Sequence, residues 1–284
     1  NLQVNKTLNI IRYNKNLQSK LKINLNNYRE FTKIEIEIIP AFMVDERDFI
    51  INIMNESDKK FFHIFLNDKK EEIKRNYITK KDNAKKIKII IDPEITSLKK
   101  LFKKCCVSKI SFVKFNRNNI SDMSYMFYGC SLLLEINFNK FNTSNVTDMS
   151  YMFYSCDSLK ELNLSKFNTH KLTDMSHMFN GCSLLKEINF SNFNTNNVTN
   201  MNNMFEYCYS LKKLDLSSFN TNNVTNMSSM FYECKLLNEL NVSYFNSKNL
   251  IDMSYMFYEC KSLKELNLND FNNENVLCFT RMFY

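Results

Sequence analysis

The chain has 284 residues, a formal net charge of +8 and 44% hydrophobic residues, enough for the cores of one or two domains. No uninterrupted apolar run approaches the roughly 18 residues that a membrane-spanning helix needs, and 2 Gly are too few for a glycine-rich phosphate-binding loop. Residues 1–104 are basic, with 23 Lys and Arg against 14 Asp and Glu, but no nucleic-acid-binding motif accompanies them, so we expect no nucleic-acid partner.

Residues 1–92 show helical and strand patterns in turn. Residues 2–28 carry apolar side chains about three to four positions apart, which predicts a helix. Residues 34–38 alternate strictly between Ile and Glu, which predicts a half-buried strand that ends at Pro40. Short apolar runs predict further strands at residues 49–54, 61–66 and 86–91, and the charged segment 69–81 is open between helix and loop. We therefore expect a small mixed N-terminal domain over residues 1–92.

The remainder, residues 93–284, consists of tandem repeats of one sequence unit. A Met-Phe pair recurs at a fixed step of 26 residues, from 126–127 to 282–283, and a cysteine keeps the same step from Cys130 to Cys260. A period of this size is typical of a solenoid, whose units bury their apolar faces against their neighbours. The first unit is degenerate, about six full repeats follow, and the last is truncated. The sequence begins without Met and stops midway through a repeat, so we expect a fragment of a longer protein, and localisation stays open between cytoplasm and cell surface.

Two periods are visible inside one unit. Met149, Met152, Phe153 and Cys156 stand at i, i+3, i+4 and i+7, which predicts one face of a short helix, and the Asp or Asn just before each such segment is a suitable helix cap. The run L-x-x-L-x-L at residues 159–164 alternates at its end as a strand does. We therefore predict an α/β fold: a leucine-rich-repeat solenoid with a short parallel strand and a short helix in each 26-residue unit.

The fuller pattern, FNTSNVTDMSYMFYSCDSLKELNLSKFNT, resembles the BspA-like subclass of leucine-rich-repeat proteins over residues 94–284. Such repeats occur in surface proteins of bacteria and in families of unicellular eukaryotes. The resemblance implies a curved solenoid used for protein–protein interaction or adhesion, without enzymatic activity.

Candidate chemical sites are few. Six of the nine cysteines share one position on the apolar stripe, so we favour reduced core thiols over disulfides or a metal site. The three histidines form neither a catalytic triad nor an H-E-x-x-H motif. We expect no metal and no cofactor. The N-x-S/T triplets, such as Asn145-Val146-Thr147, are glycan acceptors only in a secreted protein, and we favour the interpretation that an Asn-rich repeat produces them by chance.

One predicted surface is a candidate for function. Strand residues that flank the core positions must face outward, and they form columns of Glu and Asn. Opposed like charges on neighbouring strands cost roughly 0.2–1 kcal/mol per pair, so a column of Glu is not explained by stability alone. Two interpretations stay open: a polar surface that keeps the protein soluble, or a groove for a basic or polar partner. We predict a non-enzymatic interaction module that binds protein partners there, with a cell-surface adhesin as the alternative. The predicted site consists of Glu135, Asn137, Glu161, Asn163, Glu187, Asn189, Lys213, Asp215, Glu239, Asn241, Glu265 and Asn267.

Overall fold

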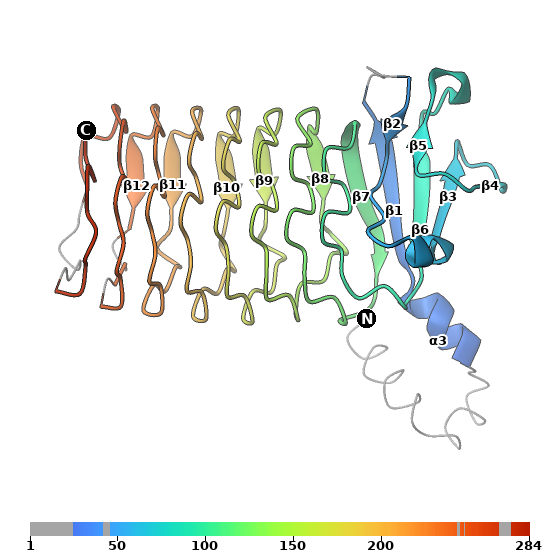
Figure 1. Cartoon of the computed structure of the whole chain (residues 1–284), viewed down its shortest axis with the longest axis horizontal. Helices are drawn as coiled ribbons and strands as arrows, with labels where there is room; N and C mark the ends of the chain where they lie inside the picture. The colour runs from blue at the N-terminus through green and yellow to red at the C-terminus, as the bar shows by residue number, and fades with distance from the viewer. Residues whose placement is uncertain (1–24, 42–45, 243–244, 247, 267–273) are drawn as a thin grey trace.

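The computed structural model describes residues 25–41, 46–242, 245–246, 248–266 and 274–284. A sheet built from the N-terminal residues stands at one end, and the 26-residue units follow it side by side in a row (Figure 1). Of the helix expected over residues 2–28, only the end lies within the described residues, where α3 covers Leu25–Thr32.

The N-terminal strands form most of a six-stranded sheet with the order β4-β3-β6-β1-β7-β8. The strands expected at residues 34–38, 61–66 and 86–91 are confirmed as β1, β3 and β6, and each buries every second side chain. The strand expected at 49–54 is wrong apart from its first residue, and the segment 69–81 contains two short strands and a 3-10 turn. The bounds are β1 Ile34–Pro40, β2 Asp48–Phe49, η1 Glu56–Phe61, β3 Phe62–Leu66, β4 Glu72–Ile73, β5 Tyr77–Ile78, η2 Lys80–Asp82 and β6 Ile87–Ile91.

Strand β7, Val107–Phe115, connects this sheet to the row of units. It pairs antiparallel with β1 and parallel with β8, Glu135–Asn137. The direction of pairing therefore changes at β7, which belongs to the degenerate first unit, and the backbone edge of the first unit is covered by β1. The division into domains at residues 92 and 93 stays a prediction.

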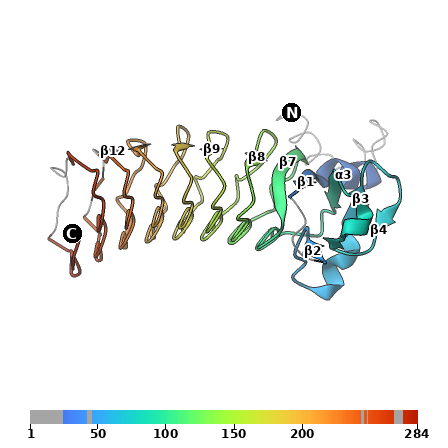
Figure 2. The ribbon, with the colours of Figure 1, turned by 90° about the horizontal axis from the view of Figure 1, so that it is seen from above.

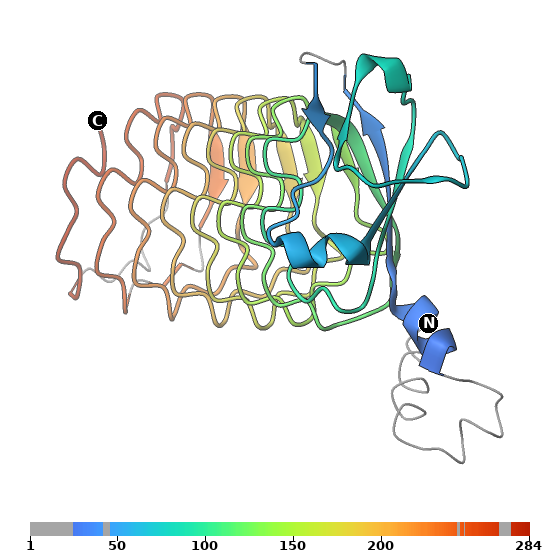
Figure 3. The same cartoon turned by 45° about the vertical axis from the view of Figure 1, so that its right-hand side comes forward.

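The predicted α/β leucine-rich-repeat solenoid is wrong. No described repeat unit contains a helix, and the strands form several separate small sheets. Each of five consecutive units contributes one strand of three residues, and these strands lie on the same side of the row (Figures 2 and 3). After β8 these strands are β9 Glu161–Asn163, β10 Glu187–Asn189, β11 Lys213–Asp215 and β12 Glu239–Asn241.

Where a helix was expected, each unit has a segment of consecutive turns, which we call the turn segment (residues 148–156 and their equivalents). Tyr151 and Ser155 have positive φ angles of 56° and 50°, and the equivalent residues of other units do too. A left-handed residue at every fourth position prevents a helix. The backbone N–H of Phe153 instead donates to the carbonyl of Met178 in the next unit, at 2.9 Å. Asp148 caps a turn, because its Oδ1 accepts from the backbone N–H of Ser150 at 2.8 Å.

The inward positions of the turn segment form the core, as the apolar stripe predicted. Met149, Met152, Phe153 and Cys156 are all fully buried. The Phe rings stack from unit to unit with centroids 5.3 Å apart between Phe127 and Phe153 and at most 5.7 Å apart elsewhere. The direction of these side chains was therefore predicted correctly, although the backbone that carries them is not helical.

The strand side is less uniform than the turn side, because its strands pair in twos. β7 pairs with β8, β9 with β10 and β11 with β12, whereas no ladder joins β8 to β9 or β10 to β11 among the described strands. We call these two interruptions seams. At the first, the ring of Phe138 packs edge-on against Phe167 of the next unit, at 4.9 Å, and at the second Phe190 packs against Phe219 at 5.2 Å. The intervening units have Leu164 and Leu216 instead, so the larger ring lies at each seam.

Candidate functional site

The predicted site residues lie together on one surface, the strand face, which we define as the outward side chains of β8 to β12. The first and third residue of each of these strands is exposed, and the middle residue is buried or half-buried. Glu265 is exposed but lies outside a strand, and Asn267 lies outside the described residues. Period-two alternation was sufficient to find this surface.

The Glu column has a charge pattern that repeats with the strand pairs. Lys109 faces Glu135 across β7 and β8, and their side chains form an ion pair of 2.6 Å. Lys213 faces Glu239 across β11 and β12 in the same way, also at 2.6 Å.

The central strand pair differs from both of its neighbours. Glu161 and Glu187 are direct partners across β9 and β10, and neither forms an ion pair with a described residue. The strand face thus places two exposed carboxylates, which form no ion pair with a described residue, side by side between two Lys–Glu ion pairs. Their mutual repulsion costs roughly 0.2–1 kcal/mol.

A groove of about 730 Å³ lies over this part of the strand face and extends from Lys109 on β7 to Asn189 on β10. Its charged lining consists of three glutamates and two lysines: Glu135, Glu161, Glu187, Lys109 and Lys160. The apolar lining comes from Leu134, Ile136, Leu162 and Ile188. The groove therefore contains the first seam and the central carboxylate pair.

The Asn column has a structural role that the sequence pattern did not reveal. Oδ1 of Asn163 accepts the backbone N–H of Ser165 at 3.0 Å, and Asn137 and Asn189 do the same two residues further on. Asp215 accepts from Ser217, which lowers the pKa of its carboxyl group. These side chains end the strands through Asx turns, and the Glu column is left as the main candidate for recognition.

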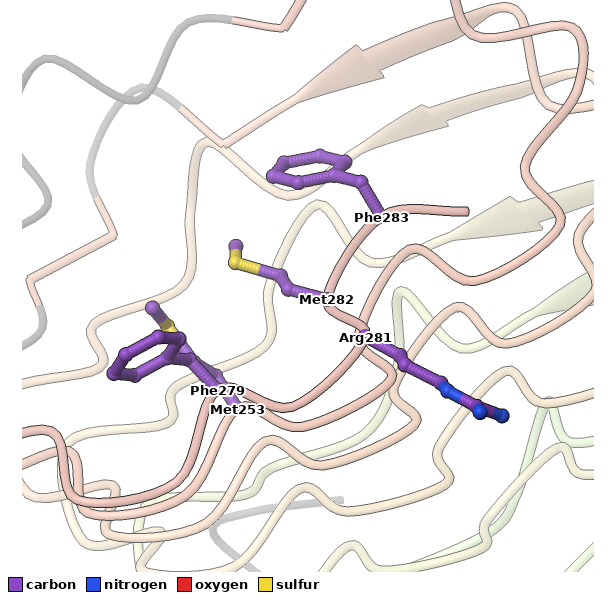
Figure 4. A pocket seen from close by; sticks show the side chains of 5 residues that line it. All are labelled: Met253, Phe279, Arg281, Met282 and Phe283. Carbon is purple, nitrogen blue, oxygen red and sulfur yellow. The ribbon is translucent and has the colours of Figure 1, made fainter.

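A second pocket of about 430 Å³ lies at the last unit. Figure 4 shows Met253, Phe279, Met282 and Phe283 around it, with Arg281 pointing to the other side. Met282 and Phe283 correspond to residues that inner units bury completely or nearly so, such as Met256 and Phe257. The pocket is thus the uncovered core surface of this unit and offers no arrangement of polar groups.

The N-x-T triplets are explained by contacts between units. Nδ2 of Asn197 donates to the carbonyl of His170 at 2.6 Å, and Oγ1 of Thr199 donates to the carbonyl of Thr173 at 3.3 Å. Asn145-Val146-Thr147 and Asn223-Val224-Thr225 make the equivalent bonds. The triplet therefore has a structural role between units, which removes it as a specific indication of a glycosylated adhesin.

The turn side carries tyrosine stacks and one polar cluster that sequence reasoning missed. Tyr125 and Tyr151 stack at 4.6 Å, and His177 continues this stack at 4.2 Å from Tyr151. Beyond it, Glu206 accepts hydrogen bonds from Nδ2 of Asn180 and of Asn203, and its burial raises the pKa of the carboxyl group. The replacement of Tyr by Asn and Glu at these positions was the available signal.

The cysteine ladder lies in the core. All nine cysteines are free, and Cys130, Cys156, Cys182, Cys208 and Cys234 are buried. Nowhere in the described residues do three or more His, Cys, Asp or Glu side chains gather as metal ligands would. Within the same part of the chain, none of the helices has the length and apolar character that crossing a membrane requires.

The geometry defines a protein of stacked, non-helical repeats with an acidic groove on its strand side. A family model described as "Mycoplasma protein of unknown function, DUF285" matches residues 96–213 and 184–284. The chain therefore belongs to this family, and the match covers nearly all of the repeat units. Searches among curated proteins and among solved structures gave no match. The resemblance to BspA-like proteins stays a prediction.

Proposed function

We propose that this chain is a non-enzymatic interaction module whose strand face binds a protein partner through basic side chains. The observation that supports it is the central pair, Glu161 and Glu187, in register on β9 and β10 without a cation of their own. Both neighbouring strand pairs have a Lys in the equivalent first position, Lys109 and Lys213. A partner's Lys or Arg above the groove would remove the repulsion between the two carboxylates and gain from complementary charge.

The test is Glu161→Lys, which gives the central pair the same Lys–Glu arrangement as its neighbours. We expect this variant to be more stable by about 0.2–1 kcal/mol and to capture much less partner from lysate of the source cells. A stability gain combined with lost capture separates recognition from folding. Capture is measured by quantitative mass spectrometry at low and at high salt, since pairing between exposed charges weakens with ionic strength.

The matched control is Glu56→Lys, the same charge reversal at an exposed residue of η1, outside the strand face. It loses an exposed ion pair with Lys59, so we expect the free energy of unfolding to fall by at most about 1 kcal/mol and capture to stay intact. Equal capture by wild type and by Glu161→Lys would eliminate the acidic strand face as the binding surface.

A further inference from the structure

A row of exposed leucines lies at the entrance to the strand face. Leu132, Leu184 and Leu236 are 38%, 45% and 46% exposed, and each precedes the Glu of its own strand by three residues. The units between them have Ser158 and Ser210 at the same position. The apolar row therefore has a period of two units, whereas the Glu column, interrupted once by Lys213, has a period of one. Leu134, 54% exposed, adds apolar surface where it lines the groove.

These two periods agree with the geometry of an α-helix. In the core, the stacked Phe rings of successive units are 5.3 Å apart between Phe127 and Phe153 and 5.5 Å apart between Phe153 and Phe179. On the strand face, hydrogen-bonded neighbours such as β9 and β10 lie about 4.7–4.9 Å apart. The pitch of an α-helix is about 5.4 Å, and seven of its residues span about 10.5 Å. One helical turn is thus within about 0.7 Å of one unit, and one heptad is close to two units.

An extended peptide does not match in this way. Side chains on one face of a β-strand repeat about every 6.6–6.8 Å, which exceeds the spacing of the units, so the mismatch increases with every unit along the row. The mismatch of a helix with the units is smaller, at most about 0.7 Å per unit, so a helix stays closer to register along the groove.

We propose that the partner's binding element is a basic amphipathic α-helix lying along the row of units. Apolar residues at i and i+7 of that helix contact Leu132 and Leu184, while Lys or Arg near i+3 or i+4 reaches Glu161. A second basic residue one turn further reaches Glu187. Helices of this kind bind in grooves by such anchors. The proposal rests on the proposed function and specifies the shape and pattern of its partner.

The probe is a fluorescein-labelled peptide of about three heptads, with Leu at one position of each heptad and Lys one turn away. One control peptide has the same composition with the leucines moved out of heptad spacing, and another contains two central prolines that prevent a helix. Binding to the full chain is followed by fluorescence anisotropy. We expect the heptad peptide to bind at least about tenfold more tightly than either control, because only it buries its leucines and pairs its lysines together.

The protein variant is Leu132→Ser with Leu184→Ser, which installs the residue that alternate units already have. We expect this double variant to bind the heptad peptide about tenfold or more weakly, with an unchanged circular dichroism spectrum. If the proline-containing peptide binds as tightly as the heptad peptide, or if the serine variant binds like wild type, the helix proposal is overturned. The proposed function fails separately, when lysate capture is indifferent to Glu161→Lys.

Discussion

Each thiol of the cysteine ladder is a hydrogen-bond donor between units. Sγ of Cys156 lies 3.1 Å from the carbonyl oxygen of Phe127, and Sγ of Cys182 lies 3.1 Å from that of Phe153. Burial raises the pKa of the Cys130 and Cys182 thiols to about 12. The folded protein therefore holds these groups as neutral thiols, the form that can donate to a carbonyl.

Alkaline pH should destabilise the protein through these thiols. A Cys in the unfolded chain ionises near pH 8.5, and the same group in the fold ionises near pH 12 at Cys182. The stabilisation is fully present below about pH 8.5 and is lost as the pH rises towards 12, because only the unfolded chain releases the proton. Each such thiol lowers the free energy of unfolding by about 1.4 kcal/mol per pH unit in this window.

The measurement is urea unfolding at several pH values across that window, for wild type and for Cys182→Ser. The hydroxyl of Ser keeps a donor near the Phe153 carbonyl but does not ionise, so the pH slope should be smaller by one proton. Tyrosines with raised pKa values, such as Tyr207 at about 12, contribute equally to both proteins. Identical slopes would show that the thiol is not held neutral by the fold.

For individual residues, the sequence predicts which side chains are buried. The spacing of apolar residues indicates which side chains point towards the core, whatever the backbone conformation. Met152, Phe153 and Cys156 lie in the core as their spacing predicted. The backbone conformation was not predictable from the same spacing, because it depends on Tyr151 and Ser155 adopting positive φ. Neither residue type signals that conformation, whereas Gly129, Gly181 and Asn203 do so in their units.

The turn segment is the element that holds consecutive units together. Its alternate backbone N–H groups, such as those of Met149 and Tyr151, donate to carbonyls of the next unit at 3.1 and 2.9 Å. Its side chains supply the buried Met and Phe rows. This one segment therefore provides both the backbone ladder and the core, and its conformation controls the stability of the row.

Gly181 is where this element is most sensitive to substitution. Its φ is +74°, and an added Cβ would lie 3.0 Å from Oγ of Ser155 in the preceding unit. Gly181→Ala should lower the free energy of unfolding by about 1–2 kcal/mol, because a left-handed residue with a Cβ is strained. Urea denaturation monitored by circular dichroism measures the loss.

The contact part of this loss can be separated from the strain. Ser155→Gly removes the opposing Oγ and places glycine at another left-handed position, so Ser155→Gly with Gly181→Ala should be more stable than Gly181→Ala alone. A double-mutant cycle with no coupling between the two sites would indicate that the Ser155 contact has no effect.

The residues of the strand face were predictable from the sequence, whereas the pairing of its strands was not. Alternation at residues 161–163 and 187–189 placed the Glu and Asn columns outward, as the structure has them. The pairing of strands in twos was missed, because Phe138 and Leu164 satisfy the same apolar pattern and the equivalent Phe112 lies in an interval that has a ladder. The Asx turns of the Asn column were missed because their partners are backbone groups.

At the scale of the whole molecule, neighbouring units are bonded unequally. Every pair of described neighbours from residue 122 onward shares the turn-side bridge, such as Asp148 with Asp174. The strand ladder is present in one interval and absent in the next, at the seams. Two units with a common ladder therefore form the smallest repeating body, which has 52 residues, twice the sequence period.

Because the intervals with and without a strand ladder alternate, we expect them to differ in their resistance to mechanical separation. The seams lack a strand ladder, so fewer backbone hydrogen bonds resist separation there than in the other intervals. Under tension between the two ends, the row should therefore extend in two-unit steps. In single-molecule stretching we expect contour-length increments of about 180 Å, the extended length of 52 residues. Phe138→Leu with Phe190→Leu should even out the intervals and shift the increments towards single units. Uniform single-unit steps in the wild type would mean that the seams have no mechanical role.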